Sequence, residues 1–396
     1  MELQFQTATL LLLIAAVVAI LTRRLRLPYS VGLVTAGIVL AISPFAPQTT
    51  LTKDLIFTAL LPPLLFEAAF SIPWNLLRRD FPVIAVLATL GVILSASVTA
   101  TGMHFLASWP WIDALVFGAL IAATDPVSVI AAFKEAKAHG RLMLLIEAES
   151  LLNDGTAAVA FGVVILLASG QQTTSIEIVK MLFVTVLGGV FCGATIALGA
   201  LLLAWRTQDH LVEITVTTVA AYGSFLLADH FGVSGVLATI TAGLVMGNFK
   251  FRKVISEHGR ESVQSFWEYA AFVANSLIFL LIGMHEARQH FVAMWLPAAT
   301  AIALVTLGRT VAIYSCCLLF SRSSLRISGK HQHILFWGGL RGAVALALAL
   351  GLPPTVPLRE EIVSISFAVV AFSVYVQSLT IVPLLRKMGE IPQRSL

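Results

Sequence analysis

Residues 112–133 read IDALVFGALIAATDPVSVIAAF. The stretch is apolar and long enough to cross a bilayer as a helix, which takes about 20 residues. Near its centre stands Thr124-Asp125-Pro126, and a proline lacks the backbone N–H and clashes with the preceding helical turn. We therefore expect this helix to break at residues 124–126. A broken helix at membrane depth is tolerated only where protein surrounds it or where it lines a wet cavity.

The composition of the whole chain predicts a membrane protein. Of 396 residues, 58% are apolar and only 12% are Asp, Glu, Lys or Arg, about half the charged fraction of a soluble domain. A water-soluble protein of this size could not bury so much apolar surface. The apolar runs are too long for a membrane β-barrel. We expect an all-α polytopic protein in a lipid bilayer, and a net charge of +4 does not indicate a nucleic-acid partner.

Thirteen apolar windows predict about thirteen transmembrane helices. They lie at residues 8–22, 31–46, 52–70, 82–106, 112–133, 140–168, 177–204, 211–229, 233–248, 264–284, 291–320, 331–352 and 361–385. The connections between them alternate in charge, with nineteen Lys and Arg residues on one side and three on the other. By the positive-inside rule the rich side is cytoplasmic, which places the N-terminus outside and the C-terminus inside.

An odd number of spans divides naturally into six, one and six. If residues 177–204 form a linker span, residues 1–168 and 211–385 become two six-helix repeats of opposite orientation. Such inverted repeats are typical of secondary transporters. We expect residues 1–396 to form a single membrane transport domain, with no soluble or regulatory domain.

The window at 140–168 carries a cluster of polar residues near its middle. Residues 147–155 read EAESLLNDG, and an ionisable group at the bilayer centre costs at least about 2.5–3.5 kcal/mol. The i,i+4 spacing places Glu149 and Asn153 on one stripe of the helix, and Ser150 and Asp154 on the next.

Asp154 and Ser150 would meet Asp125 and the Thr124 carbonyl of the neighbouring span. Such oxygen ligands suit hard cations such as Na⁺ or Li⁺ rather than soft metals. Because burial disfavours the charged form of a carboxylate, Asp154 should hold either a proton or a small cation, depending on pH.

Two arginines inside apolar windows need partners. Residues 337–343 read WGGLRGA, and glycines weaken a helix, so we expect a second break at which Arg341 meets the negative end of a half-helix. Arg309 is expected to pair with Glu149 beside Asn153. A buried pair tolerates the loss of one member badly, which makes this pair structural support for the site.

Glu67 stands near the cytoplasmic end of the window at 52–70. The residues alone leave three interpretations open. Glu67 could attract cations, act as an outer ligand, or be an ordinary interfacial charge.

Four motifs together resemble the cation/proton antiporters. They are LPPLLFE at 61–67, ATDPV at 123–127, ESLLNDG at 149–155 and GLRGA at 339–343. The likeness is strongest to the NhaP-type bacterial Na⁺/H⁺ antiporters and their animal relatives, the NHE exchangers. It implies two inverted repeats with crossed, broken helices at the site, a separate dimerisation domain, a homodimer and a multi-pass position in the plasma (inner) membrane. It also implies a secondary antiporter rather than an enzyme, without a cofactor.

The resemblance also implies roles for individual residues. Asp154 becomes the carboxylate that binds Na⁺ and carries the proton. Its co-ligands become Asp125, Thr124 and Ser150, with Glu67 acting through water. The stabilising residues become Glu149, Asn153, Arg309, Arg341 and Pro126. In this superfamily an Asn before the ion-binding Asp accompanies electroneutral one-for-one exchange. We expect the chain to lack the C-terminal regulatory region of the animal members.

These observations favour a Na⁺ (or Li⁺)/H⁺ antiporter in which both ions compete for Asp154. An empty charged carboxylate would cross hydrocarbon at a cost of several kcal/mol, so only the occupied site should reorient. A K⁺/H⁺ antiporter on the same fold is an alternative, because oxygen ligands alone do not decide ion size. A remote alternative is an intramembrane aspartyl protease with Asp125 and Asp154 as its dyad, although the family's Tyr-Asp and Gly-x-Gly-Asp signatures are absent. A passive channel would need a selectivity ring, and we find no candidate.

Overall fold

A computed structural model describes most of the chain. The described residues are 2–25, 27–44, 47, 51–136, 138, 140–169, 174–204, 209–248, 257–287 and 294–392. The first helical elements are α1 (Glu2–Leu25), α2 (Tyr29–Ile42), the π-helix η1 (Leu55–Leu60), α3 (Leu61–Ser71), α4 (Trp74–Leu106), α5 (Trp111–Ile121), α6 (Val127–Glu135), α7 (Arg141–Ala168) and α8 (Ser175–Ala204). The others are α9 (His210–His230), α10 (Gly235–Asn248), α12 (Glu257–Glu286), α13 (Trp295–Leu319), α14 (Gly329–Trp337), α15 (Ala343–Leu350), α16 (Arg359–Phe372), the π-helix η3 (Ser373–Gln377) and α17 (Ser378–Met388).

The predicted all-helical membrane fold is confirmed. Each of the thirteen apolar windows falls on a helix or on a run of consecutive helical elements. Within the described residues, eight helices are long and apolar enough to cross a membrane, and four shorter apolar helices accompany them. In lipid every backbone polar group must be satisfied internally, which is why such windows form helices. The number of thirteen spans, like the repeats, stays a prediction.

Some helices continue beyond their apolar windows. The long helix α12 begins at Glu257, several residues before the predicted window at 264–284. Its first turns are polar, and hydropathy alone does not detect helix outside the apolar layer. Several of the Lys and Arg residues used to predict the membrane orientation lie outside the described residues. They are Arg26, Lys137, Arg206, Lys250, Arg252, Lys253, Arg288 and Arg394.

Two helices are interrupted where the sequence predicts breaks. The helix α5 ends at Ile121 and α6 resumes at Val127. The helix α14 ends at Trp337 and α15 resumes at Ala343. Both expected breaks are therefore present, and each leaves a short non-helical segment between two half-helices.

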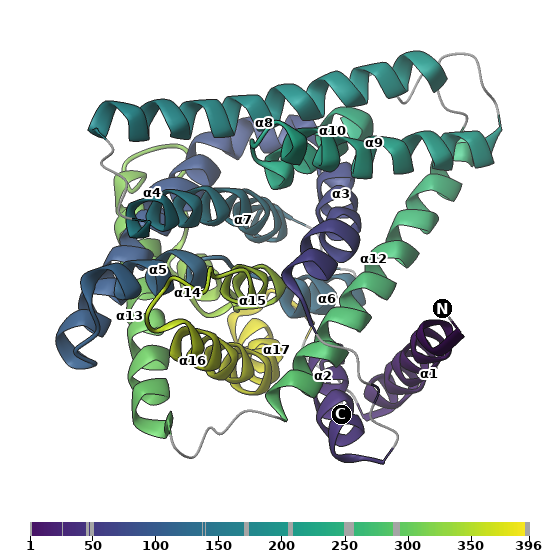
Figure 1. Cartoon of the computed structure of the whole chain (residues 1–396). Helices are drawn as coiled ribbons and strands as arrows, with labels where there is room; N and C mark the ends of the chain where they lie inside the picture. Colours follow the sequence, from purple (N-terminus) through teal and green to yellow (C-terminus); the bar gives the residue numbers. More distant parts are fainter. Residues whose placement is uncertain are drawn as a thin grey trace.

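The helices form a broad bundle around these two breaks. The long helix α8 lies along one edge with α9 and α10 beside it, and α12 runs obliquely from α9 towards α2 (Figure 1). The broken helices lie between α7, α13, α16 and α17, and α1 lies at the periphery (Figure 1). The unwound segments are thus enclosed by protein, as non-helical backbone at membrane depth requires.

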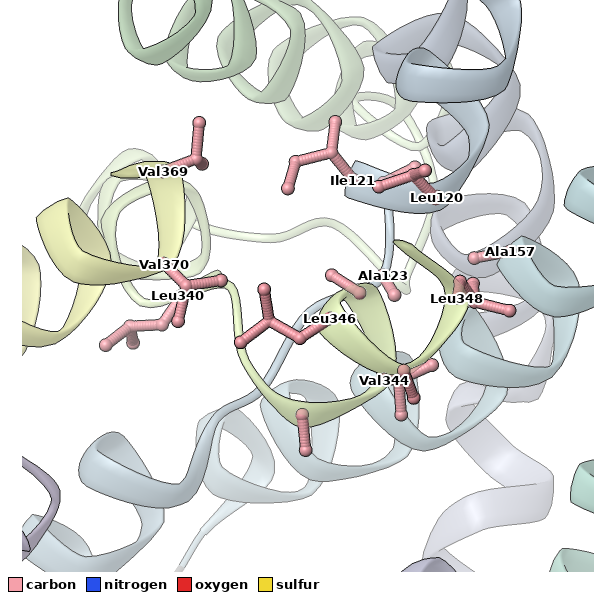
Figure 2. Packing of buried hydrophobic residues seen from close by; sticks show 14 of the residues in the cluster. Leu120, Ile121, Ala123, Ala157, Leu340, Val344, Leu346, Leu348, Val369 and Val370 are labelled. Atoms are coloured by element: carbon pink, nitrogen blue, oxygen red, sulfur yellow. The ribbon is translucent and has the colours of Figure 1, made fainter. Parts of the chain in front are cut away.

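Apolar side chains pack around the breaks and also face outward. Leu120 and Ile121 at the end of α5 belong to the same buried apolar cluster as Leu346 and Leu348 of α15 (Figure 2). On the outer surface, α8 exposes a series of large apolar side chains that includes Phe191. Exposed apolar faces of this extent are typical of surfaces that contact lipid or other protein.

Candidate functional site

The two unwound segments contact each other directly. The backbone N–H of Asp125 donates to the carbonyl oxygen of Leu340 at 2.8 Å, and the Asp125 carboxylate accepts from the N–H of Val127 at 3.0 Å. A Cβ at Gly342 would collide with that carboxylate, so only glycine permits this approach. The crossing of broken helices that the family likeness implied is therefore present, and Asp125 lies at the N-terminal end of α6.

Arg341 lies in the second break and hydrogen-bonds backbone carbonyl groups of the first break. Its Nη1 donates to the carbonyl oxygens of Ala122 at 2.8 Å and Ala123 at 3.1 Å. Carbonyls at the end of a helix lack intrahelical partners and carry partial negative charge. The buried guanidinium thus compensates the C-terminal end of α5, as predicted from the sequence.

Asp154 lies midway along α7, next to the first break. One turn earlier, the Ser150 hydroxyl donates to the Thr124 carbonyl oxygen at 2.6 Å, which ties α7 to the unwound segment. Asp154 is 8% exposed, and its Oδ1 has no hydrogen-bond partner within the described part of the chain. A charged carboxylate oxygen without a donor is costly in the protein interior. A proton or a bound cation would remove that cost.

A buried hydrogen-bond network lies behind Asp154. Arg309 donates through Nη1 to Glu149 Oε1 at 2.8 Å and through Nη2 to Glu149 Oε2 at 3.1 Å. The same Nη2 donates to the Leu335 carbonyl oxygen at 3.1 Å. The amide of Asn153 donates to Glu149 Oε1 at 3.3 Å and to the Thr124 hydroxyl at 3.2 Å. The predicted Arg309–Glu149 pair is confirmed as a two-pronged contact, and Asn153 connects it to the break.

A cavity of about 390 Å³ connects this site with the surface. Asp154 and Asn275 line it as buried residues, whereas Lys134 and Glu268 line it as exposed ones. In this conformation the cavity therefore offers a route from exposed charged side chains to Asp154. A group that must exchange ions with a solution needs such a route.

The structure brings all five predicted ion-binding residues to one cavity. They are Asp154, Asp125, Thr124, Ser150 and Glu67. Pro126 also lines the cavity and precedes α6 as its N-cap. The carbonyl and hydroxyl oxygens of Thr124 already accept hydrogen bonds from α7. In the described residues no group of three His, Cys, Asp or Glu side chains could hold a metal ion, so a cation at Asp154 would also need neutral oxygens.

The sequence interpretation missed one wall of the cavity. The helix α12 contributes Glu268, Phe272 and Asn275 to the lining. Asn275 was a usable signal, because a polar amide within the apolar window at 264–284 suggests an aqueous neighbour. Lys134 entered the prediction only as a topology charge, yet it lines the same cavity.

Crossed broken helices around a buried carboxylate, in a helical membrane protein, define the class of secondary transporters. One family, described as sodium/hydrogen exchanger, transmembrane, matches residues 11–387. The chain belongs to this family, which confirms the resemblance drawn from the four motifs.

Individual relatives agree with the family. The Na⁺/H⁺ antiporter ApNhaP of Aphanothece halophytica is 39% identical over 373 residues, covering 93% of this chain and 71% of the relative. The low-affinity Na⁺/H⁺ antiporter NhaS1 of a Synechocystis strain is 38% identical over 378 residues, covering 93% and 72%. The structure of the sodium proton antiporter MjNhaP1 from Methanocaldococcus jannaschii at pH 8 shares 21% identity at a TM-score of 0.75, covering 98% of each chain. That structural likeness supports the fold.

Proposed function

We propose that this chain exchanges one Na⁺ (or Li⁺) for one H⁺ across a plasma (inner) membrane, with both ions binding Asp154 in turn. One observation carries the proposal: a buried carboxylate oxygen without a hydrogen-bond donor lines a cavity that also has exposed charged residues in its wall. The relatives described above are named Na⁺/H⁺ antiporters, which gives no support to the K⁺/H⁺ or protease alternatives.

Competition at one carboxylate is sufficient for coupled exchange. A bound Na⁺ would be held by Asp154 and Asp125 with the neutral oxygens of Ser150 and Thr124, and Glu67 would act through water. Either ion neutralises Asp154, and only the neutral site can move through the membrane interior at low cost. An empty site stays on its own side of the membrane. Each time the site carries one cation across, it must therefore carry one proton back.

The one-for-one ratio rests on the neighbours of Asp154. Asn153 carries no charge, and its amide is bound to Glu149 and Thr124. The Glu149 carboxylate is neutralised by Arg309. Asp125 would keep one charge state, with its carboxylate bound by the Val127 N–H at the start of α6. Asp154 is then the single group that changes its occupant, and one charge is exchanged for one charge.

The conformation would be open to the cytoplasm. The cavity wall includes Lys134 at the end of α6, and the next helix begins at Arg141. Both belong to the side that the positive-inside rule makes cytoplasmic. Elsewhere in the bundle, α2 contacts η3 through the Thr35 and Tyr375 hydroxyls at 3.1 Å. The helix α12 contacts α16 through the stacked rings of His285 and Phe367.

The remaining architecture is proposed on the same basis. The first and second broken helices occupy the fifth of six windows in residues 1–168 and 211–385, as two inverted repeats require. Residues 177–204 would then be the linker span. An N-terminus outside, a cytoplasmic C-terminus and a homodimer complete the proposal, the last resting on the family likeness and on the exposed apolar side chains of α8.

Purified protein in vesicles tests this function. A Na⁺ pulse is expected to dissipate an imposed pH gradient, read from a trapped pH dye, with an equal K⁺ pulse as the comparison. One-for-one exchange predicts the same rate when a K⁺ gradient with valinomycin clamps the membrane potential at zero or at a negative value. A rate that follows the potential would exclude electroneutral exchange. The absence of any Na⁺ response would refute the function itself.

A further inference from the structure

An ion pair lies in the wall of the cavity that Asp154 also lines. Lys134 Nζ lies 3.5 Å from Glu67 Oε1. Lys134 belongs to the last turn of α6 and Glu67 to α3, so the pair joins two elements that line the cavity. The Lys134 side chain is 53% exposed and the Glu67 side chain 15%. The ammonium group thus reaches from water towards a carboxylate that faces the cavity.

Two further acids face the same space. Glu147 of α7 interacts electrostatically with both Glu67 and Lys134, and Glu268 of α12 interacts with Glu67. All four side chains line the cavity. Besides Asp125 and Asp154, three carboxylates line the cavity, one each from α3, α7 and α12, and Lys134 is the only basic residue among the described lining residues.

The pair is poorly suited to stabilising the fold. Exposed ion pairs contribute little to folding, because solvent screens them and two long side chains must be ordered. A lysine ammonium is a compact, hydrated point charge on a flexible stem. It therefore carries the same charge as an arriving alkali cation and is held loosely enough to be displaced by one.

We propose that Lys134 is a tethered competitor of the transported cation. Its ammonium neutralises Glu67 at the cavity entrance, and an incoming cation must displace it before reaching Asp154. Lys134 is then a positioning residue that sets the apparent Na⁺ affinity and has no part in carrying the proton. The inference rests on the proposed exchange function and adds an affinity-setting residue to it.

Lys134→Gln tests the proposal in vesicles at low ionic strength. Removing one positive charge within a few ångströms of the entrance acids is expected to lower the KM for Na⁺ by about two- to fivefold. The kcat should change much less, because the ion pair of Lys134 is with Glu67, which would act only through water, and not with Asp154. Added choline chloride should diminish the difference, since salt screens charges at this depth. Lys134→Arg keeps the charge and should restore a KM near that of the wild type.

Lys387→Gln is the matched control. Lys387 is an exposed lysine in the last turn of α17, on the side predicted to be cytoplasmic, and does not line the cavity. A KM for Na⁺ that is unchanged or raised in Lys134→Gln overturns the proposal, and so does an equal fall in Lys387→Gln. Wild-type protein without Na⁺-dependent exchange would instead refute the underlying function, and an altered thermal unfolding midpoint would expose structural damage.

Discussion

Asp154→Asn is expected to reduce Na⁺-driven proton movement to the leak rate of empty vesicles while the protein still folds. The amide has nearly the shape of the carboxylate but can neither carry a proton at ordinary pH nor balance the charge of a cation. Since Asp154 Oδ1 has no hydrogen-bond partner among the described residues, the substitution breaks no contact there. Thermal unfolding in detergent should therefore occur at the same temperature as in the wild type or higher.

Glu360→Gln provides the matched control for that experiment. It makes the same carboxylate-to-amide change at an exposed position in the first turn of α16, outside the cavity lining. Its exchange rate should equal that of the wild type. A second measurement is direct: Na⁺ added to the wild type in weak buffer should release a proton, and Asp154→Asn should release none. Full exchange by Asp154→Asn would remove the central residue from the mechanism.

The breaks could be predicted because their causes are local. Pro126 ends a helix through its own ring and its missing N–H, whatever surrounds it. The glycines around Arg341 act in the same way by weakening the helix. Both effects need only the neighbouring residues, and the structure has unwound segments at both positions.

The partners of the buried arginines were predictable for a different reason. A charge inside an apolar window must find a counter-charge, and the windows offer few candidates. Glu149 was the available partner for Arg309, and the free carbonyls of a broken helix suited Arg341. Both contacts are present. The requirement for neutrality thus restricted the choice without knowledge of the fold.

The cavity wall could not be derived in this way. Asn275 and Phe272 lie more than a hundred residues from Asp154, and no local pattern states which face of α12 lines the cavity. The Lys134–Glu67 contact could not be predicted either. An exposed charge such as that of Lys134 is solvated by water, so the sequence does not require a particular partner for it. Even the crossing of the two breaks came from the family likeness, since each break alone is compatible with several arrangements.

Arg309→Met is expected to destabilise the protein by about 3–5 kcal/mol, because it leaves the Glu149 carboxylate buried without its counter-charge. Both side chains are almost fully buried, at 7% and 2% exposure. Met fills a similar volume, so the loss of stability would be due to the missing charge and not to a cavity. Unfolding by SDS in mixed micelles, followed by tryptophan fluorescence, measures the change.

The double variant Arg309→Met/Glu149→Gln distinguishes a role of the ion pair in protein stability from a role in ion exchange. It removes both charges, and Gln can still accept the hydrogen bond that Asn153 donates to Glu149 Oε1. We expect it to be more stable than Arg309→Met by about 2 kcal/mol, a coupling within the range for contacting residues. Since Arg309 and Glu149 do not line the cavity, the refolded site should retain measurable exchange. A stable double variant without exchange would mean that the pair takes part in ion binding, whereas equal stabilities of the single and double variants would mean that the ion pair does not hold the site together.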